Sequence, residues 1–320
     1  MQIGYKLSTE GFGPTEIVRQ AVAAERAGFD FVEMSDHFHP WLSSQQHSAN
    51  TWVLMGMIAA KTSTIGLVTG VTCPSFRYHP AIVAQMAATL QIVSESRFTL
   101  GVGSGERLNE HITGQEFPSV SKRHERLTEA LQIIRLLWEG GYQSFEGTHL
   151  QLDDARVFDL PDRLPEICVA VSGPASVRLA QELGDGIFAV EPDPELVPAF
   201  RSSGKAGPAF AEVPLSYAVN EQSAIDSALE TGRFALAGWK VMSELPNPVN
   251  FDAATQTVRP EDVQEAFACG PDVAKHLQAA QPYVDAGFDH LVMQNVGPDP
   301  DAFLRFFADE LRDGLHSLTR

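Results

Sequence analysis

Two short stretches carry the residue types that could do chemistry. The first is Gly101-Val102-Gly103-Ser104-Gly105-Glu106, in which three glycines in five residues let the backbone approach a flat or phosphorylated ligand. The amides of such a loop can bind an anion, and Glu106 adds a carboxylate beside it. The spacing differs from the dinucleotide fingerprint, and no acidic residue about twenty positions on completes one. Taken alone, the stretch is equally well explained as a tight turn between a strand and a helix.

The second stretch is Asp36-His37-Phe38-His39-Pro40-Trp41, just past an apolar segment typical of a buried strand. We expect no metal here, because alternate loop positions point oppositely and no third ligand stands at a fitting spacing. His37 is a candidate general base, because an imidazole titrates close to neutral pH. Trp41 is either a core residue or a wall for a planar ligand.

Other residues with reactive side chains have plainer interpretations. Nothing beside Cys73 would lower the pKa of its thiol, so we expect a small core residue. Arg77, Lys122 and Arg123 are expected to be solvated charges. The chain has neither a serine nucleophile elbow nor a phosphate-loop lysine after a glycine run, which disfavours both of those enzyme classes.

The composition limits the partners. The chain has 320 residues, 44% of them hydrophobic, with 23 Lys and Arg against 41 Asp and Glu and a net charge of −18. This acidic balance disfavours nucleic acid and acidic membranes as partners. The three cysteines are far apart and lack metal-ligand spacing, which is typical of a reducing compartment. Because there is also no apolar leader and no membrane-length apolar run, we expect a cytoplasmic protein.

A repeated joint predicts the architecture. Ala27-Gly28-Phe29-Asp30-Phe31 and Ala286-Gly287-Phe288-Asp289-His290 each link a helical pattern to a strand, and Leu183-Gly184-Asp185-Gly186 does so more loosely. Alternating helices and strands imply parallel strands with right-handed crossovers, and about eight units predict a closed (β/α)₈ TIM barrel. We expect one domain over residues 1–320, with insertions at about 142–165 and 234–260. The strands are expected at Ile3–Ser8, Phe31–Met34, Ile65–Thr69, Phe98–Val102, Ile167–Val171, Gly186–Val190, Val213–Val219 and His290–Gln294.

Such a barrel determines where a site would lie. The loops that follow parallel barrel strands all meet on one face. His37, Val71, Glu106, Gly173 and Glu191 follow strands two to six in chain order. We therefore expect these residues to surround a common site.

Five segments together resemble a known family, the luciferase-like barrel oxidoreductases, and within it the deazaflavin-dependent glucose-6-phosphate dehydrogenase group. They occur in the matching order and span most of the chain. The segments are Ser35-Asp36-His37-Phe38-His39-Pro40-Trp41, Pro74-Ser75-Phe76-Arg77-Tyr78-His79-Pro80-Ala81, Gly101-Val102-Gly103-Ser104-Gly105-Glu106-Arg107-Leu108-Asn109-Glu110, Ser172-Gly173-Pro174-Ala175 and Leu183-Gly184-Asp185-Gly186.

The resemblance implies a cofactor and roles for particular residues. The cofactor is coenzyme F-420, a deazaflavin with a phosphate and an oligoglutamate tail. His37 matches the family's base, Glu106 its acid partner at the ring nitrogen, and Trp41 a residue near the reacting centre. The family also carries a non-proline cis peptide, here between Gly70 and Val71. The positions matching its cofactor site are Asp36, Gly70, Val71, Cys73, Ser104, Gly105, Asn109, Ser172, Gly173, Ala175 and Ser176.

The chain departs from the family at the substrate. The family binds a sugar phosphate with a hydroxyl, two lysines and an arginine, where this chain has Val190, Asp193 and, on a looser alignment, Ala253 and Gln264. Glu191 and Asp193 would repel a phosphate. We therefore expect hydride transfer to or from an uncharged alcohol, hemiacetal, carbonyl compound or imine, and not glucose-6-phosphate.

Two alternative functions stay open. One alternative is an FMN-dependent monooxygenase of the same barrel class. The other is a cofactor-binding barrel without catalysis, which would need neither His37 nor Glu106. We further expect a homodimer that acts on a small molecule.

Overall fold

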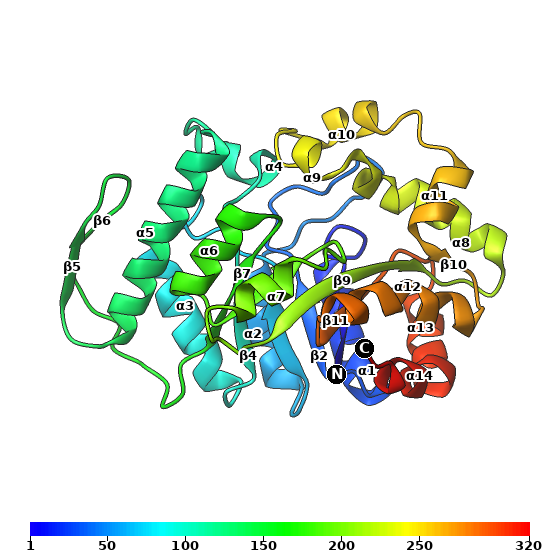
Figure 1. The fold of residues 1–320 in the computed structure, drawn as a ribbon, viewed down its shortest axis with the longest axis horizontal. Coiled ribbons are helices and arrows are strands. Elements are labelled where there is room, and N and C mark those ends of the chain that lie inside the picture. The colour runs from blue at the N-terminus through cyan, green and yellow to red at the C-terminus, as the bar shows by residue number, and fades with distance from the viewer.

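Eight parallel strands form the centre of the molecule, for which a computed structural model describes all 320 residues. The strands are β1 (Gln2–Lys6), β2 (Phe31–Met34), β3 (Gly66–Thr69), β4 (Phe98–Val102), β7 (Glu166–Ala170), β8 (Gly186–Ala189), β9 (Ala209–Ser216) and β11 (His290–Asn295). Their order in the sheet is β9-β11-β1-β2-β3-β4-β7-β8, and β8 also pairs with β9. The sheet therefore closes (Figure 1), and the predicted eight-stranded barrel is confirmed.

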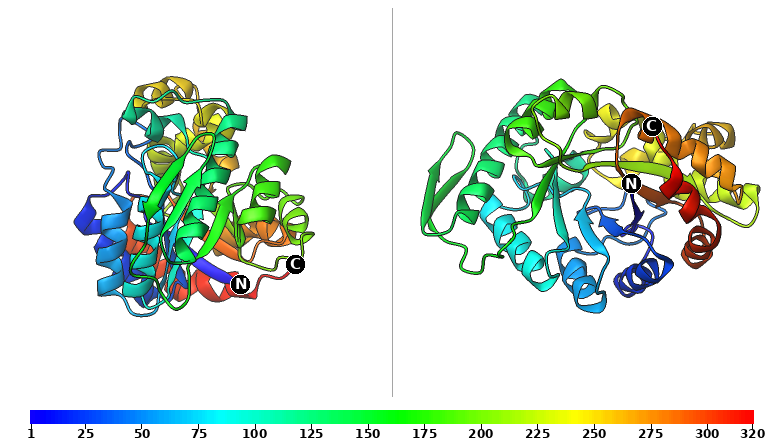
Figure 2. Two further views of the ribbon diagram at one scale, coloured as in Figure 1. Left: turned by 90° about the vertical axis from the view of Figure 1, so that its left-hand side faces the viewer. Right: turned by 60° about the horizontal axis from the view of Figure 1, so that its bottom comes forward.

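Helices surround the barrel (Figure 2). Two of them end at the glycines of the helix-to-strand joints that the sequence predicted. Gly28 and Gly287 have φ of 88° and 98°, the left-handed conformation that ends a helix most easily at glycine. Gly184, in the looser third joint, is extended instead. The helices are α1 (Pro14–Ala27), α2 (Thr51–Lys61), α3 (Pro80–Val93), α4 (Arg107–Glu110), α5 (Val120–Trp138), α6 (Pro174–Leu183), α7 (Leu196–Arg201), α8 (Glu221–Ser227), α9 (Trp239–Met242), α10 (Pro248–Ala254), α11 (Pro260–Ala266), α12 (Val273–Ala286), α13 (Pro300–Phe306) and α14 (Arg312–Ser317).

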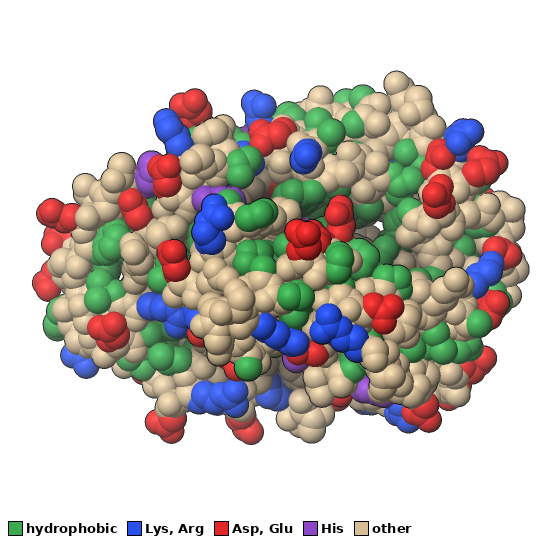
Figure 3. Space-filling view, viewed as in Figure 1, with side chains coloured by type: hydrophobic (Ala, Val, Ile, Leu, Met, Phe, Trp, Pro, Cys, Tyr) green, Lys and Arg blue, Asp and Glu red, His purple; other side chains and the backbone are tan.

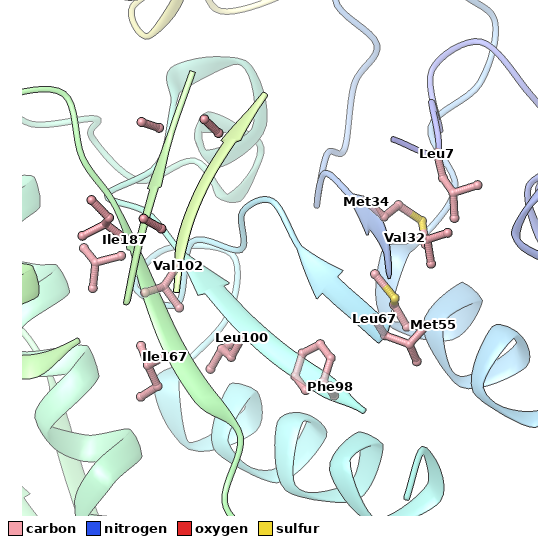
Figure 4. Close-up of a cluster of buried hydrophobic side chains, with 14 of the residues drawn as sticks. Leu7, Val32, Met34, Met55, Leu67, Phe98, Leu100, Val102, Ile167 and Ile187 are labelled. Carbon is pink, nitrogen blue, oxygen red and sulfur yellow. The ribbon is translucent and has the colours of Figure 1, made fainter. Parts of the chain in front are cut away.

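The side chains of each barrel strand alternate between the outer and the inner face of the barrel. Val32 of β2, Leu67 of β3 and Leu100 of β4 belong to the main core between the strands and the helices. Figure 4 shows these side chains on neighbouring strands, with Met55 of α2 beside Leu67. Because the opposite faces of the strands are buried inside the barrel, the strands appear in the sequence as nearly continuous apolar runs.

The inside of the barrel has an apolar layer and a charged layer. The apolar layer consists of Phe31, Val68, Cys168, Phe188, Phe210 and Val292. Nearer the carboxyl ends of the strands, Lys6 Nζ lies 3.0 Å from Glu33 Oε2 and 2.9 Å from Glu212 Oε1. These buried side chains fill the barrel below the loops, so that a ligand can enter only from the loop side.

Two segments interrupt the alternation of strands and helices. In the first, β5 (Gln143–Glu146) and β6 (Gln151–Ala155) pair antiparallel and lie away from the barrel (Figure 1). Within residues 234–260, the short helices α9 and α10 cover the loop end of the barrel. No helix combines the length and the apolar character needed to cross a lipid bilayer.

The seventh barrel strand lies earlier in the chain than predicted. β9 starts at Ala209 and ends at Ser216, whereas the sequence pattern favoured Val213–Val219. Its first residues pair with both β8 and β11 and so form the seam that closes the barrel. Its end pairs with β10 (Ala268–Cys269), a strand that was not predicted.

Candidate active site

The loops after β1, β2 and β4 bring three titratable side chains together. Glu10 follows β1, His37 follows β2 and Glu106 follows β4. His37 Nδ1 lies 2.5 Å from Glu10 Oε1, and His37 Nε2 lies 3.0 Å from Glu106 Oε1. All three side chains are at most 10% exposed. A buried imidazole between two carboxylates is an arrangement that can pass a proton from one side to the other.

Glu10 was missed by the sequence analysis. It lies in the turn Thr9-Glu10-Gly11, where no motif marks it. The available signal was its position just after the first strand, because that loop reaches the same face as the loops after strands two to six.

The two carboxylates determine the charge of His37. Burial alone would lower the pKa of His37, but the charges and hydrogen bonds of Glu106 and Glu10 raise it to about 10. Burial alone would raise the pKa of Glu10, and the charge and hydrogen bond of His37 outweigh this effect and lower it. His37 is therefore an imidazolium at neutral pH in the cofactor-free protein, with its Nε2 facing Glu106 Oε1.

Glu106 has one bonded oxygen and one free oxygen. Its Oε1 accepts a hydrogen bond from Asn109 Nδ2 at 2.7 Å. Its Oε2 is buried and has no hydrogen-bond partner. Because a buried carboxylate oxygen without a donor is costly, this atom fits a ligand that supplies a hydrogen-bond donor at this point.

Asn109 joins the two loops that carry His37 and Glu106. Besides donating to Glu106, its Oδ1 accepts hydrogen bonds from the amides of Phe38 at 2.7 Å and His39 at 3.2 Å. Its side chain is therefore largely used within the protein, although it was predicted to contact the cofactor.

Trp41 is part of a hydrophobic cluster that covers this group. Its indole is perpendicular to the His37 ring at a centroid distance of 4.8 Å and stacks on Phe234, also at 4.8 Å. Phe234, Met242 and Phe251 come from residues 234–260, so this segment supplies the apolar cover of the site. We call the group the Trp41 cluster, which consists of Trp41, Leu42, Leu108, Phe234, Met242 and Phe251.

Asp36 is bound on all sides by the protein. Its Oδ2 accepts hydrogen bonds from Trp52 Nε1 at 3.1 Å and Thr72 Oγ1 at 2.9 Å. Its Oδ1 accepts from Tyr78 OH and Arg77 Nη2, each at 3.3 Å. Its carboxylate thus fixes the start of the loop that carries His37.

The prediction of solvated charges was wrong for both arginines, Arg77 and Arg123. The side chain of Arg77 is 8% exposed and bonds Asp36 and Glu110, and that of Arg123 is 3% exposed and pairs with Glu244. Each arginine is buried because carboxylates from distant parts of the chain neutralise it, which no local pattern revealed. Lys122 is exposed, as predicted.

The bulge after β3 has the geometry that the resemblance implied. The peptide bond between Gly70 and Val71 is cis. A Cβ at Gly70 would lie 2.0 Å from Glu33 Oε1, and one at Gly103 would lie 2.7 Å from Val71 Cγ2. The bulge therefore packs against the charged layer on one side and the glycine loop on the other.

Cys73 contacts the glycine loop. A Cβ at Gly105, where φ is 83°, would lie 2.8 Å from Cys73 Sγ, and Ser104 precedes it in the loop. Cys73 is 4% exposed, and burial raises the pKa of its thiol well above the usual range. Its thiol is thus an inert packing group, as the sequence analysis expected.

The loop before α6 lies at the same end of the barrel and is open. An ideal Cβ at Gly173 would meet nothing within 4 Å. The Ser176 hydroxyl donates to the Gly173 carbonyl at 3.0 Å and accepts from the Ser172 amide at 3.1 Å. A cavity of about 450 Å³ lies beside Ala175, with His124 of α5 and Arg178 of α6 in its wall.

The predicted substrate residues lie after β8 and do not contact the His37 group. The Val190 side chain is 46% exposed, and its carbonyl accepts from Tyr283 OH at 3.4 Å. Glu191 is exposed, and Asp193 Oδ1 accepts from the Glu195 amide at 2.9 Å. Figure 3 shows hydrophobic and acidic side chains around a hollow near the middle of this face. No group of three or more His, Cys, Asp or Glu is placed to hold a metal ion.

With this geometry established, comparisons with known proteins identify the family. The model of the family "Luciferase-like monooxygenase" matches residues 1–290. The chain belongs to this family.

Three similar proteins narrow the position of this luciferase-like chain. It is 36% identical over 324 residues to the F420-dependent glucose-6-phosphate dehydrogenase of Microbacterium testaceum, covering 97% of the chain and 96% of the relative. It is 38% identical over 293 residues to the F420-dependent hydroxymycolic acid dehydrogenase of Mycobacterium tuberculosis, covering 89% and 80%. A solved F420-dependent secondary alcohol dehydrogenase, in complex with an F420-acetone adduct, superposes with a TM-score of 0.91 at 29% identity, covering 98% of each chain.

Proposed function

We propose that this chain is a coenzyme F-420-dependent dehydrogenase or reductase. It moves a hydride between the deazaflavin and an uncharged alcohol, hemiacetal, carbonyl compound or imine. The observation that carries the proposal is the buried Glu10–His37–Glu106 group with one unpartnered carboxylate oxygen. The three relatives, all F420-dependent by name, support the same cofactor.

The side chains of the group have complementary tasks. An alcohol carbon releases a hydride only as its hydroxyl proton leaves, so a base must take that proton. Glu10 holds Nδ1 of His37, which leaves Nε2 as the base once Glu106 has taken its proton. Coenzyme F-420, when bound, supplies a carbon that accepts the hydride and a ring nitrogen that takes up a proton. Glu106 would supply that proton, and its unpartnered oxygen Oε2 is the atom left available to face the ring nitrogen.

We assign the cofactor to the loops that surround Glu106. The ring would rest on Gly70 and Val71 and beside Cys73, Ser104 and Gly105, and the phosphate would lie at the open backbone of Gly173. Asp36 and Asn109 would act by holding the walls of the site, because their side chains already bond the protein. Ser172, Ala175 and Ser176 complete the assignment, beside the cavity that contains His124 and Arg178.

We propose an uncharged substrate because the predicted substrate positions Val190, Glu191 and Asp193 provide no cation. Val190 offers an apolar surface, and Glu191 and Asp193 add negative charge. Burying a phosphate dianion beside these carboxylates would cost on the order of several kcal/mol, because the phosphate would have no cation to pair with. Glucose-6-phosphate is therefore excluded by this proposal, although several relatives are named for it.

The decisive experiment compares two cofactors on the purified protein. Titration with coenzyme F-420 and with FMN, followed by fluorescence, should show micromolar or tighter binding of F-420 and weaker binding of FMN. Turnover with uncharged secondary alcohols should then produce reduced F-420. Tighter FMN binding with oxygen-dependent turnover would favour the monooxygenase, and binding of F-420 without turnover of any alcohol or carbonyl compound would favour a non-catalytic barrel.

We also propose that the protein is a cytoplasmic homodimer that pairs through α2 and α3. These adjacent helices are apolar on their outer as well as their inner faces, with Val53, Met57, Ile82 and Val93 each at least 48% exposed. The same face of a second copy can cover such a surface in a two-fold symmetric dimer, which leaves no apolar patch exposed. Light scattering should give twice the chain mass, and Met57→Asp should give a monomer; a monomeric parent protein would refute the proposal.

A further inference from the structure

Arg77 is a buried cation that the proposed proton transfers do not use. It lies in the segment between β3 and α3, and its side chain is 8% exposed. Its Nη2 donates to the Asp36 main-chain carbonyl and, at 3.3 Å, to Asp36 Oδ1. Its Nε donates to Glu110 Oε1 at 3.2 Å, and its own amide donates to Glu110 Oε2 at 3.0 Å. One residue thus bonds two carboxylates and a backbone carbonyl.

The two partners of Arg77 are neighbours of the reacting pair. Asp36 directly precedes His37 in the loop after β2, and Glu110 lies one helical turn after Glu106 on α4. Arg77 therefore crosslinks the loop that carries His37 to the helix that begins at Glu106. Asn109 makes a second crosslink between the same elements, through Phe38 and His39.

We propose that Arg77 is a positioning residue, which holds His37 Nε2 at its 3.0 Å distance from Glu106 by tying Asp36 to Glu110. The inference rests on the proposed function, in which this distance governs the proton transfer. Arg77 itself does not contact His37 or Glu106 through any hydrogen bond.

An arginine suits this task better than a lysine. The guanidinium presents five N–H donors in a rigid plane, so that one side chain can bond groups on two sides. A lysine keeps the charge but holds it at a single point. Arg77→Lys therefore preserves the neutralisation of Asp36 and Glu110 and removes only the fixed geometry between them.

The matched control is Arg126→Lys. Arg126 bonds the carbonyl of Ser75 in the same segment, with Nε at 3.2 Å and Nη2 at 2.6 Å, and does not touch Asp36 or Glu110. It also lies over the Phe76 ring at 4.5 Å. The control thus makes the same chemical change at a residue of α5 that bonds the same segment, and it leaves the crosslink in place.

The first readout needs no cofactor. NMR of protein labelled at histidine measures the pKa of His37, and a His37→Gln variant assigns its signal. This pKa depends on how close the two carboxylates lie to the imidazole. The pKa of His37 in the parent protein is about 10. Arg77→Lys should lower it, because Glu106 moves away while Glu10 and the nearby Lys6 stay in place, and Arg126→Lys should leave it unchanged.

The second readout is turnover with F-420 and an uncharged alcohol. Arg77→Lys should lower kcat roughly 10-fold to 100-fold, about the value of one charge-assisted hydrogen bond, with KM changed less than about 3-fold. Glu110→Gln, which keeps the shape of the side chain, should lower kcat in the same direction, and it serves if Arg77→Lys does not fold. Circular dichroism and thermal melting establish folding for each variant.

The outcomes separate this inference from the proposed function. The positioning role would be refuted if the pKa of His37 were unchanged in folded Arg77→Lys and in folded Glu110→Gln. It would also be refuted if the control Arg126→Lys changed this pKa by the same amount as Arg77→Lys. Failure of the parent protein to bind F-420 or to turn over would refute the proposed function, while the NMR titration would still decide whether Arg77 sets the geometry of the pair.

Discussion

The two halves of the barrel mouth are built from different interactions. In the first half, the loops after β1 to β4 are joined by charged hydrogen bonds among buried groups, including His37, Glu106 and Arg77. In the second half, Val190 after β8 is 46% exposed, and Phe234 stacks on Trp41 without any charged bond. The charged pairs of residues 234–260, Arg123–Glu244 and Arg233–Asp252, each have a partly exposed carboxylate and are not part of the Trp41 cluster.

This difference matches two separate demands. A proton transfer needs donor and acceptor atoms held within hydrogen-bond distance, and charged hydrogen bonds between loops can fix such a distance. The choice of substrate depends on shape and charge, which side chains on loops can change without disturbing the proton path. We therefore expect substitutions in the first half to change kcat and substitutions in the second half to change specificity.

The largest expected effect is that of His37→Ala. It should lower kcat by about 10²–10⁴-fold, the usual value of a positioned acid or base, while the dissociation constant for F-420 changes little. Steady-state kinetics and fluorescence titration measure the two quantities. The exposed His47 provides the control, since His47→Ala should behave as the parent protein. Near-normal turnover in His37→Ala would contradict the division between the halves.

The next effect concerns Glu10 and pH. Because the folded-state pKa of His37 is about 10 and its unfolded value is near 6.5, its contribution to stability is complete below pH 6.5 and is lost as pH rises toward 10. Glu33, with a pKa raised to about 8, adds a fall in the same direction. Glu10→Gln should reduce the His37 part, so that the difference between the two proteins isolates it.

Two measurements check the Glu10 prediction. Urea unfolding at pH 6 and pH 10 should give a smaller loss of unfolding free energy for Glu10→Gln than for the parent protein. The variant should also lose roughly 10-fold to 100-fold in kcat, the equivalent of a hydrogen bond to a charged group. Equal pH dependence in both proteins would show that Glu10 does not hold the proton on His37.

A smaller effect on chemistry is expected for Phe234→Ala in the second half. Removing the ring opens space beside Trp41, so kcat/KM should rise for bulkier alcohols relative to small ones, with stability lowered by about 3 kcal/mol. Kinetics on a series of alcohols of increasing size and urea unfolding measure both. Phe158→Ala is the control, because Phe158 is 68% exposed and lies outside the site. An unchanged size preference would mean that Phe234 does not border the substrate.

The smallest effect is expected for Asp193→Lys. Exchanging this partly exposed charge should improve the inhibition constant of glucose-6-phosphate only about 2-fold to 5-fold, the usual range for an ion pair near the surface. Turnover of neutral alcohols should not change. A parent protein that oxidises glucose-6-phosphate efficiently would show that the second half of the mouth accepts a phosphate and that the comparison was misjudged.

The sequence predicted the framework well because its signals are local. Glycines at helix ends and apolar runs of strand length depend only on neighbouring residues, and they predicted the barrel and most strand positions. β9 was misplaced because its first residues owe their pairing to β8 and β11 on both sides, which the local pattern did not contain. The single-domain organisation and the cofactor contacts of individual residues stay predictions.

By itself the sequence determined the barrel and the candidacy of His37 and Glu106, and the resemblance to a known family implied the bulge at Gly70 and Val71. The tertiary structure decided which groups surround them: Glu10, 27 positions before His37, binds its Nδ1, and Arg77, 41 positions after Asp36, is buried against it. The reason is that a charged side chain can be buried only where a partner of opposite charge meets it. Such meetings depend on how separate loops converge at one end of the barrel.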